Sequence, residues 1–134
     1  MMAAIQDALH CRLTGFAALS AVPVYDQVPQ SITPECNDGF PFITIGEDTH
    51  SMWDTDTEEG LDVVIEIHVW SRAGGRIYVK EIQDKIRDCL HLHRLDVVGC
   101  NTVIMDMESS AAHRQNDGVT FHGIQAFRLL IERN

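Results

Sequence analysis

Positive charge is scarce in this sequence. Ten Lys and Arg residues stand against 20 Asp and Glu residues, which gives a formal net charge of −10 over 134 residues and a pI near 4.9. Proteins that bind nucleic acid draw much of their affinity from cationic side chains that neutralise phosphates. The charge balance therefore argues against a conventional DNA- or RNA-binding module.

Long apolar runs are also absent. No run approaches the roughly 20 apolar residues that a membrane-spanning helix needs. Near the amino terminus, Asp7 and His10 interrupt the apolar segment that a signal peptide would require. We therefore expect a soluble protein that is made in the cytoplasm and has no membrane partner.

Motifs for catalysis and metal binding are missing too. The four cysteines form no C-x-x-C pair, and the chain has no nucleophile elbow, P-loop or dinucleotide-binding fingerprint. The acidic segment that begins at Asp54 approaches the spacing of a calcium loop. It places Gly60 one position late, however, and has Ile65 where the EF-hand has a glutamate. We expect no catalytic residue, no metal and no cofactor.

The chain does contain regular helical and extended patterns. Apolar residues recur at helical spacing over 3–20 and 76–92. Alternating or β-branched runs predict strands over 24–28, 40–48, 61–71, 102–110 and 119–131, with a further short strand over 95–98. Short turns separate most strands, so the sequence predicts one α+β domain over residues 1–134. Its sheet is mainly antiparallel, and its element order is α-β-β-β-α-β-β.

The strand over 61–71 has the clearest pattern. Alternate positions are all apolar and predict a core-facing side, formed by Leu61, Val63, Ile65, Ile67 and Val69. The remaining positions are mixed in chemistry and predict a side that meets solvent or a partner, formed by Asp62, Val64, Glu66, His68 and Trp70. The acidic stretch 50–60 before this strand is predicted to be an exposed loop.

Several phrases follow one another in a specific order and spacing. They are YDQVPQ at 25–30, FPFITIGE at 40–47, WDTDTEEG at 53–60, HVWSR at 68–72, DGVTFHG at 117–123 and the strand with Phe127 and Arg128. Together they resemble the tail-completion or tail-terminator family of long-tailed phages, prophages and gene transfer agents. The resemblance extends over nearly the whole chain. The stretch 31–38 departs from it, because it is longer than the usual link between the first two phrases.

The resemblance implies a structural virion protein and not an enzyme. Family members are similar in fold to α+β terminators that form a six-fold ring on the head-proximal end of the tail tube. There they stop tube polymerisation and join the tail to the neck. The implied partners are further copies of the chain in a homohexamer, the major tail tube protein and a neck or stopper protein. DNA would pass through the ring without specific binding, and the chain would reside at the tail–neck junction of the virion.

A closed ring requires two different complementary lateral surfaces on each subunit. Because tryptophan is enriched at interfaces, the interface candidates centre on the two tryptophans and the outward side of 61–71. They are Trp53, Trp70, Val64, His68 and Arg72. A negative lumen would repel DNA, so the candidates for the channel are Glu47, Asp48, Asp54, Asp56, Glu58 and Glu59. Alternatively, the acidic residues keep the chain soluble and the tryptophans cap the core.

Two other functions stay open. The chain could be another component of the head–tail neck, such as a stopper or head-completion protein. It could also be a small α+β enzyme or ligand-binding domain that uses histidines and carboxylates such as His68 and Glu66. The enzyme requires a concave pocket with shifted pKa values, whereas the terminator requires a flat subunit with two lateral patches.

Overall fold

A computed structural model describes residues 2–28, 39–53, 59–72 and 75–133 of the chain. Within them lie two α-helices, one short 3-10 helix and five strands. In chain order these are α1 (Met2–Thr14), η1 (Ala17–Leu19), β1 (Val24–Tyr25), β2 (Phe42–Met52), β3 (Gly60–Ser71), α2 (Gly75–Leu90), β4 (Cys100–Arg114) and β5 (Phe121–Arg133). The α+β class and the predicted order of helices and strands are confirmed.

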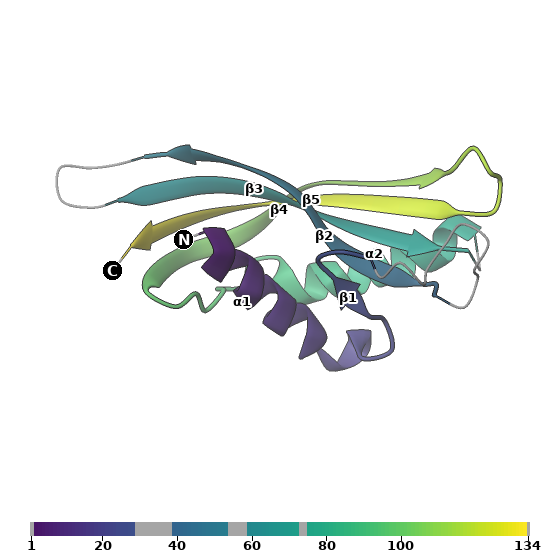
Figure 1. Cartoon of the computed structure of the whole chain (residues 1–134), viewed down its shortest axis with the longest axis horizontal. Coiled ribbons are helices and arrows are strands. Elements are labelled where there is room, and N and C mark those ends of the chain that lie inside the picture. Colours follow the sequence, from purple (N-terminus) through teal and green to yellow (C-terminus); the bar gives the residue numbers. More distant parts are fainter. Residues whose placement is uncertain (1, 29–38, 54–58, 73–74, 134) are drawn as a thin grey trace.

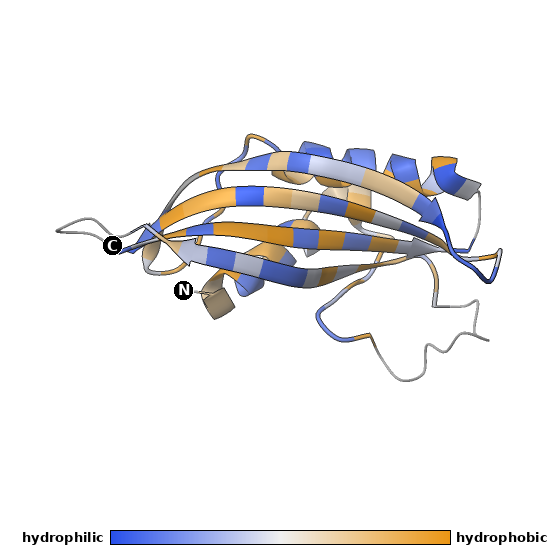
Figure 2. Cartoon of the chain, turned by 90° about the horizontal axis from the view of Figure 1, so that it is seen from above, coloured by the Kyte–Doolittle hydropathy of each residue, from blue (hydrophilic) through white to orange (hydrophobic). Residues whose placement is uncertain are grey.

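The strands form one sheet in the order β1-β2-β3-β5-β4. Only β1 and β2 pair in parallel, and the other three pairs are antiparallel. Both helices lie against the same face of this long, curved sheet (Figure 1). We call the opposite face, which none of the described helices covers, the open face (Figure 2). The β2–β3 and β4–β5 connections lie at opposite ends of the sheet.

The core lies between the two helices and the sheet. Because apolar residues recur at helical spacing, each helix turns one stripe towards the strands. The fully buried side chains of this layer include Ile5, Leu9 and Leu13 of α1, Val79 and Ile86 of α2, and Val63, Ile65, Ile67 and Val69 of β3. Burying a side chain of this size stabilises the fold by about 1.5–3 kcal/mol. The predicted core-facing side of β3 is therefore confirmed.

Several predicted boundaries were wrong. The first helix ends at Thr14, before Gly15, and not at residue 20. The segment 95–98 is an irregular loop and not a strand. Leu95 and Val97 alternate in this segment because both are buried in the core from the loop. β2 continues to Met52, so the first residues of the predicted acidic loop are extended.

The continuation of β2 has a simple cause in strand pairing. β2 stays in register with β3 as far as the pair Met52 and Leu61, after a bulge between Ile45 and Asp48. The hydrogen bonds of this long hairpin outweigh the local acidic composition, which suggested a loop. The hairpin carries the exposed residues of β2 to one end of the molecule.

Candidate interaction surface

The open face carries the polar and aromatic side of β3. Along this strand the residues that alternate with the core are partly exposed, as the sequence predicted: Asp62, Val64, Glu66, His68 and Trp70. Buried and more exposed positions also alternate along β5. The register of β3 with β2 and β5 then decides which other side chains join them.

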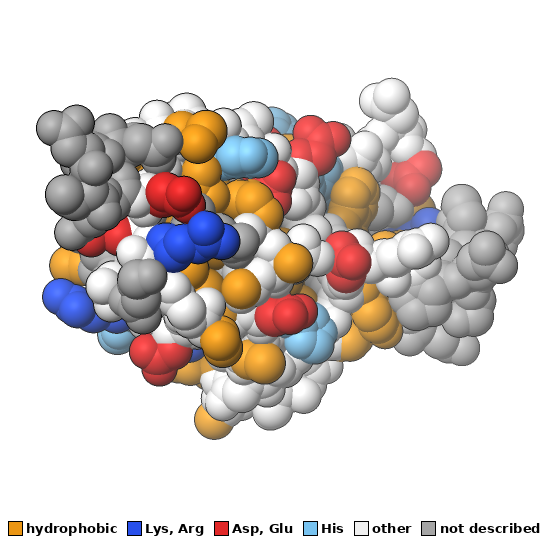
Figure 3. All heavy atoms as spheres, turned by 60° about the vertical axis from the view of Figure 1, so that its left-hand side comes forward, with side chains coloured by type: hydrophobic (Ala, Val, Ile, Leu, Met, Phe, Trp, Pro, Cys, Tyr) orange, Lys and Arg blue, Asp and Glu red, His pale blue; other side chains and the backbone are white. Residues whose placement is uncertain are grey.

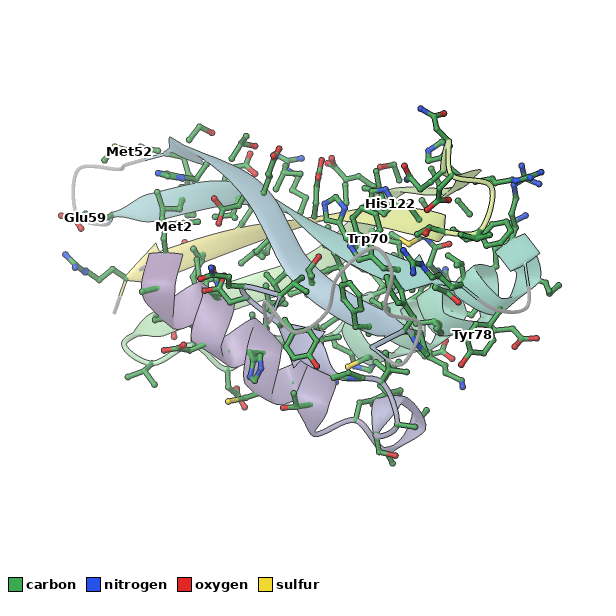
Figure 4. All side chains as sticks on the ribbon, turned by 45° about the vertical axis from the view of Figure 1, so that its right-hand side comes forward. Met2, Met52, Glu59, Trp70, Tyr78 and His122 are labelled. Atoms are coloured by element: carbon green, nitrogen blue, oxygen red, sulfur yellow. The ribbon has the colours of Figure 1, made fainter. Side chains whose placement is uncertain are left out.

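Aromatic rings cross three strands at one end of the open face. Trp70 of β3 lies between its register partners, Phe42 of β2 and His122 of β5. The indole stacks on the His122 imidazole with ring centroids 3.7 Å apart and an interplanar angle of 7°. Phe42 stacks at 6.5 Å from the indole and contacts Phe40 at 5.0 Å. Figure 4 shows Trp70 and His122 side by side.

A hydrogen-bonded pair of histidines extends this row. The His68 Nδ1 and His122 Nε2 atoms lie 2.7 Å apart, and His68 Nε2 lies 2.9 Å from Glu66 Oε2. One donor arrangement satisfies both contacts: His122 Nε2–H donates to His68 Nδ1, and His68 Nε2–H donates to the carboxylate. We call Phe40, Phe42, Glu66, His68, Trp70 and His122 the aromatic–histidine strip.

An arginine ties the strip to the β4–β5 turn. The Arg72 guanidinium carbon lies 4.5 Å from the centroid of the Phe40 ring, and Arg72 Nε–H donates to Thr120 Oγ1 at 3.0 Å. Thr120 donates its hydroxyl proton to Asp117 Oδ2 at 2.6 Å and its backbone N–H to Asp117 Oδ1 at 2.8 Å. The hydroxyl bond is the main cause that lowers the pKa of Asp117 to about 2. These bonds fix the turn beside the strip.

The strip makes the stability of the chain sensitive to pH. Burial, followed by the nearby charges of His68 and His113, lowers the pKa of His122 from 6.5 to about 4. Between these two values the unfolded chain binds a proton that the folded chain does not, so stability is lost as the pH falls through this window. We expect the free energy of unfolding, measured in urea, to fall by about 1–2 kcal/mol between pH 7.5 and pH 5.

The variant His122→Phe is the control for this expectation. It keeps a ring against Trp70 but has no proton to gain, so its stability should change less over the same range. Asp117 does not interfere, because its pKa lies below pH 5 in both states, at 3.8 in the unfolded chain and at about 2 in the folded chain. An unchanged pH dependence in the variant would show that His122 is not the responsible group.

The structure divides the predicted interface residues into two groups. His68 and Trp70 belong to the strip, Arg72 contacts it, and Val64 lies on the same face, opposite Arg128. Trp53 lies at the other end of the sheet, where its backbone N–H donates to the Gly60 carbonyl. Trp70 follows Gly60 by ten positions along β3, which corresponds to roughly 33 Å of strand.

Trp53 packs tightly over that end of the sheet. A Cβ atom added at Gly60 would come within 2.3 Å of the indole, so only glycine allows this contact. The Trp53 Nε1 atom is buried and has no hydrogen-bond partner in the described part of the chain. The indole therefore caps the β2–β3 end of the fold.

The predicted acidic residues also separate. Glu47 and Asp48 are exposed in the outer half of β2. Glu59 is exposed too, but its carboxylate forms an ion pair with Arg133 at 2.9 Å. Asp54, Asp56 and Glu58 lie outside the described residues. Whether any of these six lines a channel stays a prediction.

Sequence reasoning missed the other half of the strip. His122 and Phe42 join Trp70 only because β3 pairs with both β2 and β5. Alternation along 119–131 could have placed His122 on one face of its strand. It could not have identified the tryptophan as its neighbour, since the two residues lie far apart in the sequence.

Exposed apolar side chains mark both ends of the elongated subunit. Met52 is 71% exposed and Val98 91% exposed near the β2–β3 end, whereas Ile77 is 68% exposed and Val119 54% exposed near the β4–β5 turn. Hydrophobic side chains lie among charged ones on the face shown in Figure 3. The two ends differ in sequence and in shape.

A pocket lies away from the strip. It measures about 440 Å³ between α1 and the 94–98 loop, and its charged lining residues are Asp7, Arg12, Arg94 and Asp96. Within the described ranges, no group of three or more His, Cys, Asp or Glu residues is arranged to hold a metal ion. Nor is any of the described helices long and apolar enough to cross a membrane. The histidine and carboxylate named for an enzymatic site are not in this pocket.

Comparisons with known proteins give consistent matches. Residues 3–132 match the family model described as "Tail completion protein gp17". The chain is 27% identical to the tail completion protein gp17 of Bacillus phage SPP1 over 113 aligned residues. The alignment covers 84% of this chain and 84% of the phage protein. It also resembles a chain in the solved structure "Virion of native gene transfer agent (GTA) particle", with a TM-score of 0.83. That match covers 98% of this chain and 96% of the other at 22% identity, and it establishes the fold.

Proposed function

The chain belongs to the tail completion protein gp17 family, a family of structural tail proteins and not an enzyme class, and from this membership we propose that it is a tail terminator. In this role it caps the head-proximal end of the tail tube, stops polymerisation of the tube and joins the tail to the neck of the head. The family match over residues 3–132 carries the proposal.

The shape of the subunit supports a closed ring of identical copies, which we take to be a hexamer. A ring requires each copy to present two different surfaces that fit one another. The chain has two unlike ends with exposed apolar side chains, Met52 at one and Val119 at the other. Its partners in this account are its own copies, the major tail tube protein and a neck protein. It assembles from the host cytoplasm into the tail–neck junction.

The charge of the chain supports a conduit for DNA. Six copies with a net charge of −10 each would carry about −60, which favours sliding of DNA over binding. In this proposal the exposed Glu47 of β2 faces the channel or a neighbouring ring. The strip around Trp70 is buried by a neighbouring protein of the particle, because large aromatic side chains anchor such contacts.

Polymerisation of the tube in the test tube checks this function. The purified major tail tube protein of the same particle is grown into tubes, and the labelled chain is added during growth. We expect elongation to stop, with the label at one end of each tube in electron micrographs. Unchanged elongation would contradict the proposal, and label along the whole tube would indicate a tube component instead.

A further inference from the structure

Within the described part of the chain, other segments pair with only half of the outer edge of β4. In the first half of the strand, the Leu92 N–H donates to the Met105 carbonyl at 2.8 Å, and the Met107 N–H donates to His91 Nδ1 at 3.0 Å. From residue 109 to residue 114, no described residue forms a hydrogen bond with the backbone groups that point outward from this edge. The sequence there is Ser-Ser-Ala-Ala-His-Arg.

The hydrogen bonds between β4 and β5 show which backbone groups of β4 point away from the sheet. The Gln115 N–H donates to the Thr120 carbonyl at 2.8 Å, so Gln115 faces β5. Because the direction alternates along a strand, the N–H and C=O groups of Ser110, Ala112 and Arg114 point away from the sheet. An unpaired edge whose side chains are mostly small readily accepts another strand, and natural proteins usually protect such an edge.

Among the described residues, the outer edge of β2 also has a partner over only part of its length. β1 pairs with residues 43 and 44 and ends there. The Trp53 N–H donates to the Gly60 carbonyl, so alternation turns the backbone groups of Asp48, His50 and Met52 outward. None of the described residues pairs with these three. The free stretch of β2 and the free stretch of β4 lie at opposite ends and opposite edges of the sheet.

The two free edges fit each other. β2 and β4 run in opposite directions within the sheet, so a second copy in the same orientation would present its β2 edge antiparallel to β4. The residues whose backbone groups point outward, 48, 50 and 52 in β2 and 110, 112 and 114 in β4, have their side chains on the helix-covered side of the sheet. Asp48 and His50 are in register with the core residues Ile65 and Val63, and Ala112 is in register with the buried Gly123. Pairing them therefore keeps the helices of both copies on one side.

One register aligns all three outward residues of each strand. It places Ser110 opposite Met52, Ala112 opposite His50 and Arg114 opposite Asp48. The arginine and the aspartate then form an opposite-charge pair across the strands, an arrangement that stabilises antiparallel sheets. Shifting the strands by two residues in either direction loses one backbone pair and this charge pair.

We propose that the β4 edge of one copy, residues 109–114, pairs with the β2 edge of the next copy, residues 47–52, and that this contact joins neighbouring subunits through one continuous sheet. The inference rests on the proposed ring and specifies its lateral contact. The contact is heterologous, because each copy pairs its β4 edge with one neighbour and its β2 edge with the other. The contact can therefore repeat from subunit to subunit.

Disulfide cross-linking tests the register. Ala111 and Ser51 face each other on the open face in a non-hydrogen-bonded pair, whose Cα atoms lie about 4.5 Å apart, within disulfide reach. The double variant Ala111→Cys, Ser51→Cys should give, after mild oxidation, a ladder of covalent multimers on a non-reducing gel. The matched control Ala111→Cys, His50→Cys places the thiols on opposite faces of the sheet and should give none. The single variants give the background from the native cysteines.

The outcomes separate this contact from the proposed function. Native mass spectrometry of the same samples reports whether rings form. Rings without a ladder would overturn the strand pairing and leave the terminator role in place. If the control pair gives the same ladder as the test pair, the register is wrong. Protein that stays monomeric at every concentration would overturn both the contact and the ring.

A charge exchange provides a second test that does not depend on cysteine chemistry. Arg114→Glu places two acidic residues opposite each other and should weaken subunit association by about fivefold at each contact. Adding Asp48→Arg to the same chain restores an opposite pair and should recover the assembly. No recovery in the double variant, with both variants folded by circular dichroism, would overturn the pairing.

Discussion

Replacing Trp70 with alanine is expected to reduce the joining of heads to tails by about tenfold or more. The indole is the largest side chain of the strip and lies between Phe42 and His122 on the open face. Truncating an aromatic residue at the centre of an interface commonly costs 2 kcal/mol or more, which is about 30-fold in affinity. The measurement is the fraction of joined particles in electron micrographs when the variant replaces the native chain.

Tyr78→Ala is the matched control for this prediction. Tyr78 is also a half-buried aromatic residue, but it lies on α2 on the other side of the sheet (Figure 4). Its loss removes an aromatic ring without touching the strip. The role of the strip is contradicted if the two variants join heads to tails equally well.

Replacing Phe127 with alanine is expected to lower the free energy of unfolding by about 3–5 kcal/mol. Phe127 is fully buried in the middle of β5, where its register partners are Ile65 of β3 and Met107 of β4. Removing its ring leaves a cavity where the sheet meets the helices. Because a domain of this size is stable by only about 5–15 kcal/mol, the variant would lose a large part of its stability.

Urea unfolding monitored by circular dichroism measures this loss. Phe121→Ala is the comparison, since Phe121 begins the same strand but is only half-buried. Its loss should be clearly smaller than that of Phe127→Ala. Equal losses in the two variants would show that the core is not centred where the structure places it.

Local patterns predicted most of the fold. The alternation over 61–71 identified both faces of β3, and the helical spacing over 76–92 identified α2 almost to its ends. These signals succeed because the burial of each residue follows directly from the period of its own element. Two local predictions were wrong: residues 50–52 are extended and not a loop because β2 pairs with β3 as far as Leu61, and residues 95–98 are not a strand but an irregular segment in which Leu95 is buried.

The candidate surface was only partly predictable. Trp70 and His68 could be placed on the outward side of their strand, but their contacts depend on a partner strand 50 residues further along the chain. The Asn116-Asp117-Gly118 turn between two extended runs is typical of a hairpin, but no local pattern indicates that β5 lies beside β3. The tight packing of Trp53 over Gly60 is likewise a tertiary contact.

The central claim is that the chain ends the tail tube and joins it to the head. Electron microscopy of particles made with and without its gene tests this most directly, through the length of the tails. The account predicts overlong free tails beside filled, tailless heads when the gene is removed. Tails of normal length that stay unattached would contradict tube termination and indicate a neck protein on the head side, and normal particles would contradict both roles.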